Sequence, residues 1–86
     1  MKTTDARALI KRYVEPNPHR PGVEDARLVH YGVPVWALVG HYHAVGRDAA
    51  QVAEDYELPR AAVDAALAYY SKHKAVIDAR IAANAA

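Results

Sequence analysis

Hydrophobic residues near the start of the chain recur at intervals of three and four, the spacing typical of one helix face. They predict a first helix over about residues 4–14, with Thr4 as its N-cap. Three prolines and a glycine follow between Pro16 and Gly22, which excludes regular structure and indicates an ordered arm or a linker. The pattern then weakens and allows one short strand, over Arg27–Tyr31.

From Pro34 onward the helical spacing returns in several further segments. Pro34 suits the first position of a helix, where its missing N–H costs no hydrogen bond, and Gly46 is expected to end that helix. Asp48 is the expected N-cap of the next helix. Another helix is predicted over about residues 59–72 and a last one over about 74–83. The chain is therefore predicted to be mainly α.

Residues 48–70 have the pattern of a helix-turn-helix. Ala53 supplies the small residue that lets two helices cross closely, Leu58 the buried turn residue, and Val63 the aliphatic contact on the second helix. The connection is short enough to keep the helices steeply crossed, although Glu57 stands near the place of the usual turn glycine. This spacing indicates the fold more strongly than it indicates DNA binding.

The second helix of this motif is poorly equipped to read DNA. On the register of its inward residues, the exposed positions are Arg60, Ala61, Asp64, Ala65 and Ala68. Base edges are read by Arg, Lys, Asn or Gln, and Asp64 would repel phosphate. The DNA-binding candidates are Arg60, near the helix N-terminus where base contacts usually fall, and Arg47. A motif used only for packing is the alternative.

The composition predicts a small helical protein with a thin core. Of the 86 residues, 19 are alanine and none is phenylalanine, so helix propensity is high and apolar area is low. A chain of this length is marginally stable alone, so we expect a homodimer or a partner. Because there is no cysteine, disulfides, thiol catalysis and thiolate metal sites are excluded. The net charge of +1 does not indicate nucleic-acid binding through bulk charge.

No pattern in the sequence points to a targeting or membrane-spanning segment. The first residues lead into no apolar run of the signal-peptide kind. The stretch between Arg27 and Arg47 lacks formal charges, but its histidines, glycines and proline argue against a membrane span. We therefore expect a cytoplasmic protein with no membrane association.

The polar residues do not form a constellation that predicts catalysis. His41 and His43 are two residues apart, so they point to different sides of a helix rather than forming a metal pair. The acidic residues Glu54, Asp55 and Glu57 could hold Mg²⁺, but a solvated helix end explains them more simply. We expect no enzyme activity, and hence no catalytic residue, metal site, cofactor or small-molecule substrate.

Several of these segments resemble one known protein family, the domain of unknown function 433. The resemblance covers about residues 27–81 and is carried by Val33–Gly40, Gly46, Val52–Tyr56 and Val63–Tyr70. It implies a homeodomain-like helix-turn-helix of the kind found in small bacterial and archaeal proteins, many of which resemble antitoxins encoded beside a PIN-like ribonuclease toxin. The N-terminal helix and proline-rich arm are longer than the family's usual short β-hairpin entry.

The resemblance makes protein-binding residues worth naming. Trp36 is expected to anchor the core or a dimer interface, with a toxin contact as the alternative. The last helix either closes its own core or lies in a partner's groove. Its partner-binding candidates are Lys74, Ile77, Arg80 and Ile81. Arg80 could then neutralise the acidic centre of a PIN-like nuclease. A rival basic site near the N-terminus comprises Arg7, Lys11 and Arg12.

Together these observations predict a small, mainly α, homeodomain-like helix-turn-helix bundle with at most one short β-strand. Residues 1–22 form an N-terminal helix and a proline-rich arm, and residues 23–86 form the helix-turn-helix domain with its C-terminal helix. The expected function is that of an antitoxin that inhibits a PIN-like ribonuclease, with operator DNA as a second partner through which it represses its own operon. The alternative is a stand-alone DNA-binding transcriptional regulator.

Overall fold

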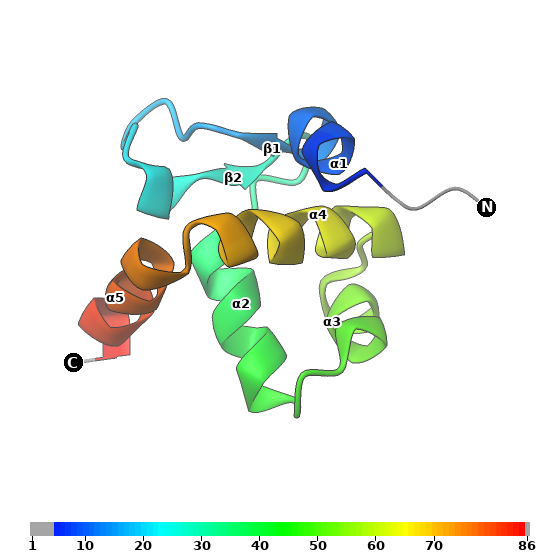
Figure 1. The fold of residues 1–86 in the computed structure, drawn as a ribbon. Helices are drawn as coiled ribbons and strands as arrows, with labels where there is room; N and C mark the ends of the chain where they lie inside the picture. The colour runs from blue at the N-terminus through cyan, green and yellow to red at the C-terminus, as the bar shows by residue number, and fades with distance from the viewer. Residues whose placement is uncertain (1–4, 86) are drawn as a thin grey trace.

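A computed structural model describes residues 5–85, and they are mainly helical, as the sequence predicts (Figure 1). The elements in chain order are α1 (Ala6–Tyr13), β1 (Val14–Glu15), the 3-10 helix η1 (Val23–Asp25), β2 (Arg27–Leu28), α2 (Val35–Ala44), α3 (Ala49–Tyr56), α4 (Arg60–Lys72) and α5 (Lys74–Ala85). Helix α4 runs through the middle, with α1 and the two strands on one side and α2 and α3 on the other. Most other elements therefore pack against α4.

The first helix begins one residue later than the sequence predicts. Asp5 is its N-cap, because the Asp5 carboxylate accepts a hydrogen bond of 3.0 Å from the amide of Arg7. Thr4, the predicted cap, lies outside the described residues. The helix ends at Tyr13, because Val14 already has extended backbone and enters β1.

A two-stranded antiparallel sheet follows α1, and the sequence predicts only one of its strands. Val14 pairs with Leu28 and Glu15 with Arg27, whose Nε lies 2.9 Å from the Glu15 carboxylate. Strand β2 is shorter than the predicted Arg27–Tyr31, because the backbone of His30 is left-handed and turns the chain away. A strand of two residues is too short to show alternation, which is why β1 left no pattern.

The proline-rich segment is an ordered arm that closes this hairpin. Asn17 begins its turn by accepting hydrogen bonds from the amides of His19 and Arg20. Farther on, the Tyr69 hydroxyl of α4 donates a 2.8 Å hydrogen bond to the carbonyl oxygen of Val23. The arm, the sheet and α1 therefore join residues 5–22 to the rest of the described chain.

The boundaries of the central helices follow the predicted capping residues closely. Pro34 is the N-cap of α2 rather than its first helical residue, because its ψ of 138° is extended. After α2 ends, Gly46 and Arg47 both have left-handed backbone, with φ of 70° and 62°. Asp48 caps α3 as predicted, and its carboxylate accepts a 3.1 Å hydrogen bond from the amide of Gln51.

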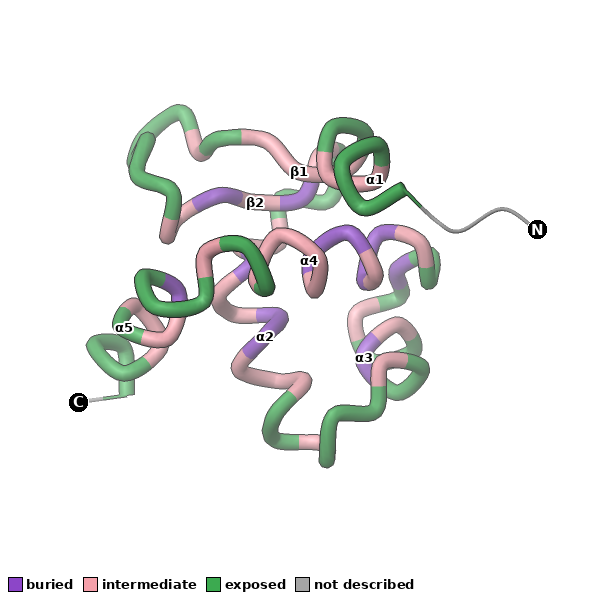
Figure 2. Tube along the Cα trace, in the orientation of Figure 1, coloured by how far each residue is buried: buried purple, intermediate pink, exposed green. Residues whose placement is uncertain are grey.

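The core is built from aliphatic side chains of β2 and the four helices α2 to α5 (Figure 2). Its largest fully buried side chains are Leu28, Val35, Leu38, Val39, Val52, Val63 and Ile77. Helix α4 adds Ala62, Ala65 and Ala66, all fully buried, and such small side chains let neighbouring helices approach closely. Alanine enrichment therefore serves helix packing around α4.

Candidate functional site

The turn between α3 and α4 has the features of a helix-turn-helix. Glu57 has left-handed backbone with φ of 55°, the conformation for which glycine is preferred. Leu58 is buried beneath the turn, and its amide donates a 2.9 Å hydrogen bond to the carbonyl oxygen of Ala53. Pro59 then caps α4, where its fixed φ is compatible with the entry into the helix.

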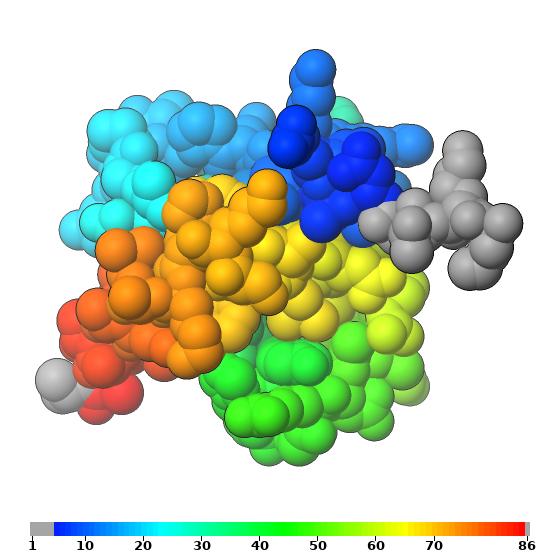
Figure 3. Space-filling view, viewed as in Figure 1, coloured from blue at the N-terminus to red at the C-terminus, as the bar shows by residue number. Residues whose placement is uncertain are grey.

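Helix α1 covers the side of α4 that the sequence analysis assigns to solvent. Ala65 is fully buried and Ala61 and Ala68 are half-buried, so the prediction that Ala65 is exposed is wrong. The reason is that α1 is docked on α4, and the contact between these two helices is the most extensive between any two elements. Figure 3 shows the blue atoms of α1 directly above the yellow atoms of α4. This face cannot enter a DNA groove while α1 is docked.

Arg60 is exposed at the start of α4, as a base-reading residue must be. Its Nε lies 3.0 Å from the Asp64 carboxylate, and the two side chains are 57% and 45% exposed. An exposed pair of this kind is weak, so Arg60 can leave it at little cost. The Asp64 carboxylate nevertheless stays beside any phosphate that approaches, which opposes binding of DNA at this end.

The C-terminal helix closes the protein's own core. Ile77 is fully buried and Ile81 packs against the core, so the prediction that Ile77 contacts a partner is wrong. Val76, the neighbouring aliphatic residue of α5, is 46% exposed. It lies one position before Ile77, and neighbouring positions on a helix are about a quarter-turn apart.

Arg80 and Trp36 contact each other inside the chain. The Arg80 guanidinium lies 4.2 Å from the centroid of the Trp36 ring, a cation–π arrangement. The Arg80 Nε also donates a 3.1 Å hydrogen bond to Asp25, and these two side chains are only 21% and 13% exposed. Arg80 thus fastens α5 to η1 and α2, which leaves it badly placed to enter the acidic centre of another protein.

Arg47 and Lys74, predicted for DNA and for a partner respectively, line the same groove of about 400 Å³. The groove lies between the end of α2, the C-terminal half of α4 and the start of α5. In Figure 3 the orange atoms around the α4–α5 junction border the green atoms at the end of α2. Sequence reasoning did not bring these two cations together, because 27 positions separate them along the chain.

A three-residue network fixes the charges on one wall of this groove. Asp78 accepts hydrogen bonds from the Tyr70 hydroxyl at 2.7 Å and from the Lys74 ammonium at 2.8 Å. The hydrogen bond from Lys74 is the largest cause that lowers the pKa of Asp78. The hydrogen bond to Asp78 is in turn the largest cause that raises the pKa of Lys74 and of Tyr70. At neutral pH, Asp78 and Lys74 are therefore charged and Tyr70 is not.

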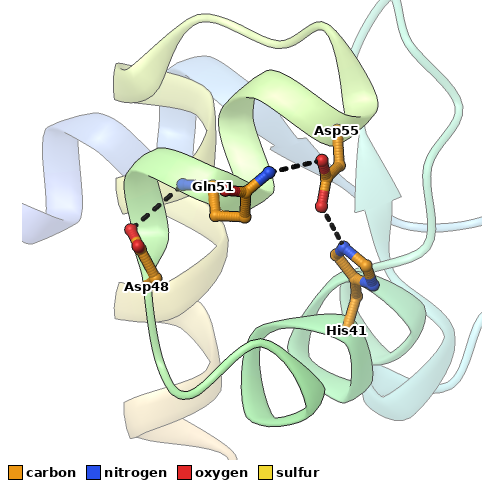
Figure 4. Close-up of polar contacts among 4 residues, drawn as sticks. All are labelled: His41, Asp48, Gln51 and Asp55. Carbon is orange, nitrogen blue, oxygen red and sulfur yellow. Dashed lines mark hydrogen bonds and ion pairs between the residues drawn. The ribbon is translucent and has the colours of Figure 1, made fainter.

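A second polar network joins α2 to α3 (Figure 4). His41 Nε2 lies 2.6 Å from one Asp55 oxygen, and the side-chain amide of Gln51 donates a hydrogen bond of 2.7 Å to the other oxygen. The hydrogen bond with His41 is the largest cause that lowers the pKa of Asp55. The His41 ring also meets Tyr56 edge-on, with 5.5 Å between centroids. Because His41 belongs to α2 and both Gln51 and Asp55 belong to α3, this network is a clasp that links the two helices.

Sequence reasoning missed this His41–Asp55 pair because it compared residues that are close along the chain. It weighed His41 against His43 and grouped Asp55 with neighbouring acids, while the true partners are 14 positions apart. The available signal was the length of the turn between α2 and α3, which brings the two helices back alongside each other.

The outer face of α1 is basic. Arg7, Lys11 and Arg12 are all exposed, and α1 itself contains no acidic residue. The Arg12 guanidinium lies 5.4 Å from the Tyr13 ring centroid. None of the three forms an ion pair with another residue of the described range 5–85. The rival basic site of the sequence analysis is therefore a free surface on a packed helix.

Among residues 5–85, no three side chains of His, Asp or Glu converge in a way that could hold a metal ion. In the same range, no helix combines the length and apolar character that crossing a lipid bilayer requires.

Comparison with known proteins places the central part of the chain in a family. The model of the family described as "Protein of unknown function (DUF433)" matches residues 25–70. The match is shorter than the 27–81 suggested by the resemblance, and α1, β1 and α5 lie outside it. No curated protein and no solved structure matches the chain significantly. The matched segment holds η1 in part, β2, α2, α3 and most of α4, and by this match the chain belongs to the DUF433 family.

Proposed function

We propose that this protein is an antitoxin that binds and inhibits a PIN-like ribonuclease. One observation favours a protein partner over direct DNA reading, namely that α1 covers the outward side of α4 and buries Ala65. A helix that reads bases must place its side chains in the major groove, and here the small side chains of α4 contact another helix instead. The identity of the partner rests on the resemblance of the DUF433 segment to antitoxins.

The surface proposed to bind the ribonuclease is the outer face of α1. Its exposed cations Arg7 and Lys11 are four positions apart, so they lie on one side of the helix, with Arg12 beside them. PIN-like nucleases have acidic, metal-binding centres, and guanidinium and ammonium groups form charge-assisted hydrogen bonds with carboxylates. Arg80 is less suitable for this role, because Asp25 and Trp36 already engage it.

The proposed antitoxin works in the cytoplasm as a homodimer. A chain of 86 residues buries only about 60% of its unfolded surface when it folds, less than a larger domain does, so association adds stability that the small core lacks. Light scattering coupled to size exclusion measures the mass directly. A mass equal to one chain at all concentrations up to about 1 mM would reject the dimer but not the antitoxin function.

The antitoxin function predicts a PIN-like reading frame beside the gene of this protein, and co-expression of the two proteins tests it. Wild-type protein should restore growth, and the purified protein should inhibit the nuclease on a single-stranded RNA substrate. Lack of binding to that nuclease would reject the antitoxin function altogether.

A matched pair of double variants tests the proposed surface. Arg7→Gln with Lys11→Gln should weaken inhibition by about tenfold or more, because both lost cations face the partner's acidic centre. Arg20→Gln with Lys72→Gln removes the same charge from exposed positions elsewhere and should inhibit like wild type. Equal inhibition by both variants would place the binding surface away from α1.

The second candidate function, a stand-alone transcriptional regulator, is favoured by the exposed position of Arg60 at the start of α4. Gel shifts on the protein's own promoter test it at several salt concentrations. Specific readout predicts binding that Arg60→Gln weakens by about 1–3 kcal/mol at one base position. If the affinity for DNA were the same for the promoter and for other sequences, and the same for wild type and Arg60→Gln, this function would be excluded. The antitoxin proposal would remain intact.

A further inference from the structure

The groove between α2, α4 and α5 has the size and lining of a small-molecule site. Its volume of about 400 Å³ falls within the range that ligand pockets occupy in proteins. It combines apolar and polar groups, with Leu67 on one side and the Ser71 hydroxyl near the end of α4. Neither the antitoxin proposal nor the helix-turn-helix uses these residues.

One wall of the groove is a continuous row of aromatic rings. The His43 ring lies 5.7 Å from the centroid of Tyr42 and 5.9 Å from that of Tyr70. These side chains come from α2 and α4, so two helices hold the rings in place. Such a wall offers π-faces and edges against which a planar heterocycle can stack.

The charge available to a ligand in this groove comes mainly from Arg47. Lys74 and Asp78 compensate each other at 2.8 Å, and the Tyr70 hydroxyl satisfies the other Asp78 oxygen. Arg47, in contrast, forms no ion pair with any residue in the described range. The groove is therefore suited to an anion at the end that Arg47 lines.

The backbone fixes the position from which Arg47 projects. Its φ of 62° is left-handed, which is uncommon for an arginine, and its amide donates a 2.8 Å hydrogen bond to the Tyr42 carbonyl. The loop after α2 is thus pinned to the same helix that supplies the aromatic wall. An anion held by Arg47 would therefore lie in the same groove as that wall.

We propose that this groove binds a nucleoside monophosphate, with the base against the Tyr42–His43–Tyr70 wall and the phosphate at Arg47 and Ser71. The rings explain a planar base, and the unpaired Arg47 guanidinium, with the Ser71 hydroxyl in the lining of the same groove, explains a phosphate. Inorganic phosphate would use only the cation, and a nucleoside would use only the rings. The proposal is independent of the antitoxin function, because its residues lie outside α1.

The test is an NMR titration of the ¹⁵N-labelled full chain with AMP, adenosine and inorganic phosphate. AMP should shift amide signals of residues 42–47 and 67–78 and bind at least about tenfold more tightly than adenosine or phosphate. Shifts confined to other residues would overturn the proposal. So would equal binding of AMP and inorganic phosphate, or equal binding of AMP and adenosine.

Variants separate the two halves of the ligand. Arg47→Gln should weaken AMP about tenfold and leave adenosine unchanged, whereas Arg20→Gln, an exposed arginine in the arm, should change neither. His43→Ala removes an exposed ring and should weaken AMP and adenosine alike, by about fivefold or more. Retained amide dispersion shows that each variant folds. AMP binding that neither Arg47→Gln nor His43→Ala alters would place the nucleotide elsewhere.

Discussion

The two halves of α4 belong to one continuous helix but meet different surroundings. The first half carries Arg60, Ala61, Asp64 and Ala65, and α1 lies over it and buries Ala65. The second half carries Leu67, Tyr70 and Ser71, which line an open groove. The comparison teaches that the exposure of a helix face depends on which segments dock there. The spacing of apolar residues along α4 identifies the face that packs on α2 and α3, but it does not reveal the second face that α1 covers.

The first prediction concerns the second half of α4 and tests how much the packing of α5 in the core contributes to stability. Ile77→Ala should lower the free energy of unfolding by about 2–5 kcal/mol, because it leaves a cavity at a fully buried position. Val76→Ala, on the same helix but 46% exposed, should stay within about 0.5 kcal/mol of wild type. Urea denaturation measures both. Equal losses for the two variants would contradict the assignment of α5 to the core.

The second prediction probes the covered half. Ala65→Leu should destabilise the fold by about 1–3 kcal/mol, because the larger side chain meets α1 at a fully buried position. Ala79→Leu makes the same change at an exposed helical position and should be nearly neutral. Thermal unfolding compares them. If Ala65→Leu were as stable as wild type, α1 would not be docked as described.

The third prediction concerns the clasp between α2 and α3, below both halves of α4. The pKa of Asp55 is lowered in the folded state, so its contribution to stability is present above pH about 4. That contribution is lost as the pH falls through the lower folded pKa. Asp55→Asn should therefore reduce the fall in Tm between neutral pH and acid, as measured by circular dichroism.

The control for the clasp is the adjacent exposed residue. Glu54→Gln removes one negative charge next to Asp55. The Glu54 side chain forms no ion pair within the described residues. Its melting curves should keep the acid dependence of wild type. If Glu54→Gln and Asp55→Asn had the same dependence of Tm on pH, the hydrogen bond between His41 and Asp55 would not be the source of the acid dependence.

The smallest expected effect is at the exposed start of α4. Arg60→Gln should change stability by about 0.3–0.5 kcal/mol, because its pair with Asp64 is an exposed contact between residues four positions apart. High salt should diminish even this difference. A loss above about 1.5 kcal/mol, measured in urea at low salt, would show that Arg60 has a packing role.

Sequence reasoning worked best where a single residue type enforces a local geometry. Asp48 has the short carboxylate side chain typical of an N-cap, and it caps α3 as the sequence predicts. Helical spacing also predicted the helices themselves, because an apolar face must be buried whatever covers it. These features depend on neighbours within one or two helical turns.

The rest of the structure depended on contacts between distant parts of the chain. Ala65 is buried by α1, which lies more than 50 positions earlier in the chain. Alanine is also common on solvent-exposed helix faces, so its presence does not indicate burial. The engagement of Arg80 by Asp25 likewise spans 55 positions. Periodicity carries no information on such pairings. Of the predicted site residues, Arg47 and Lys74 were named separately, and only the fold showed that they share a groove.

The short hairpin also bears on how this protein avoids misassembly. Its two strands pair over only two residues each, so each outer edge exposes few free backbone groups. Longer edges of this kind act as templates on which other chains can add strands and start fibres. The sheet therefore orders the N-terminal segment against α4 with little risk of edge-to-edge aggregation. Association between copies by addition of strands to this sheet is therefore disfavoured.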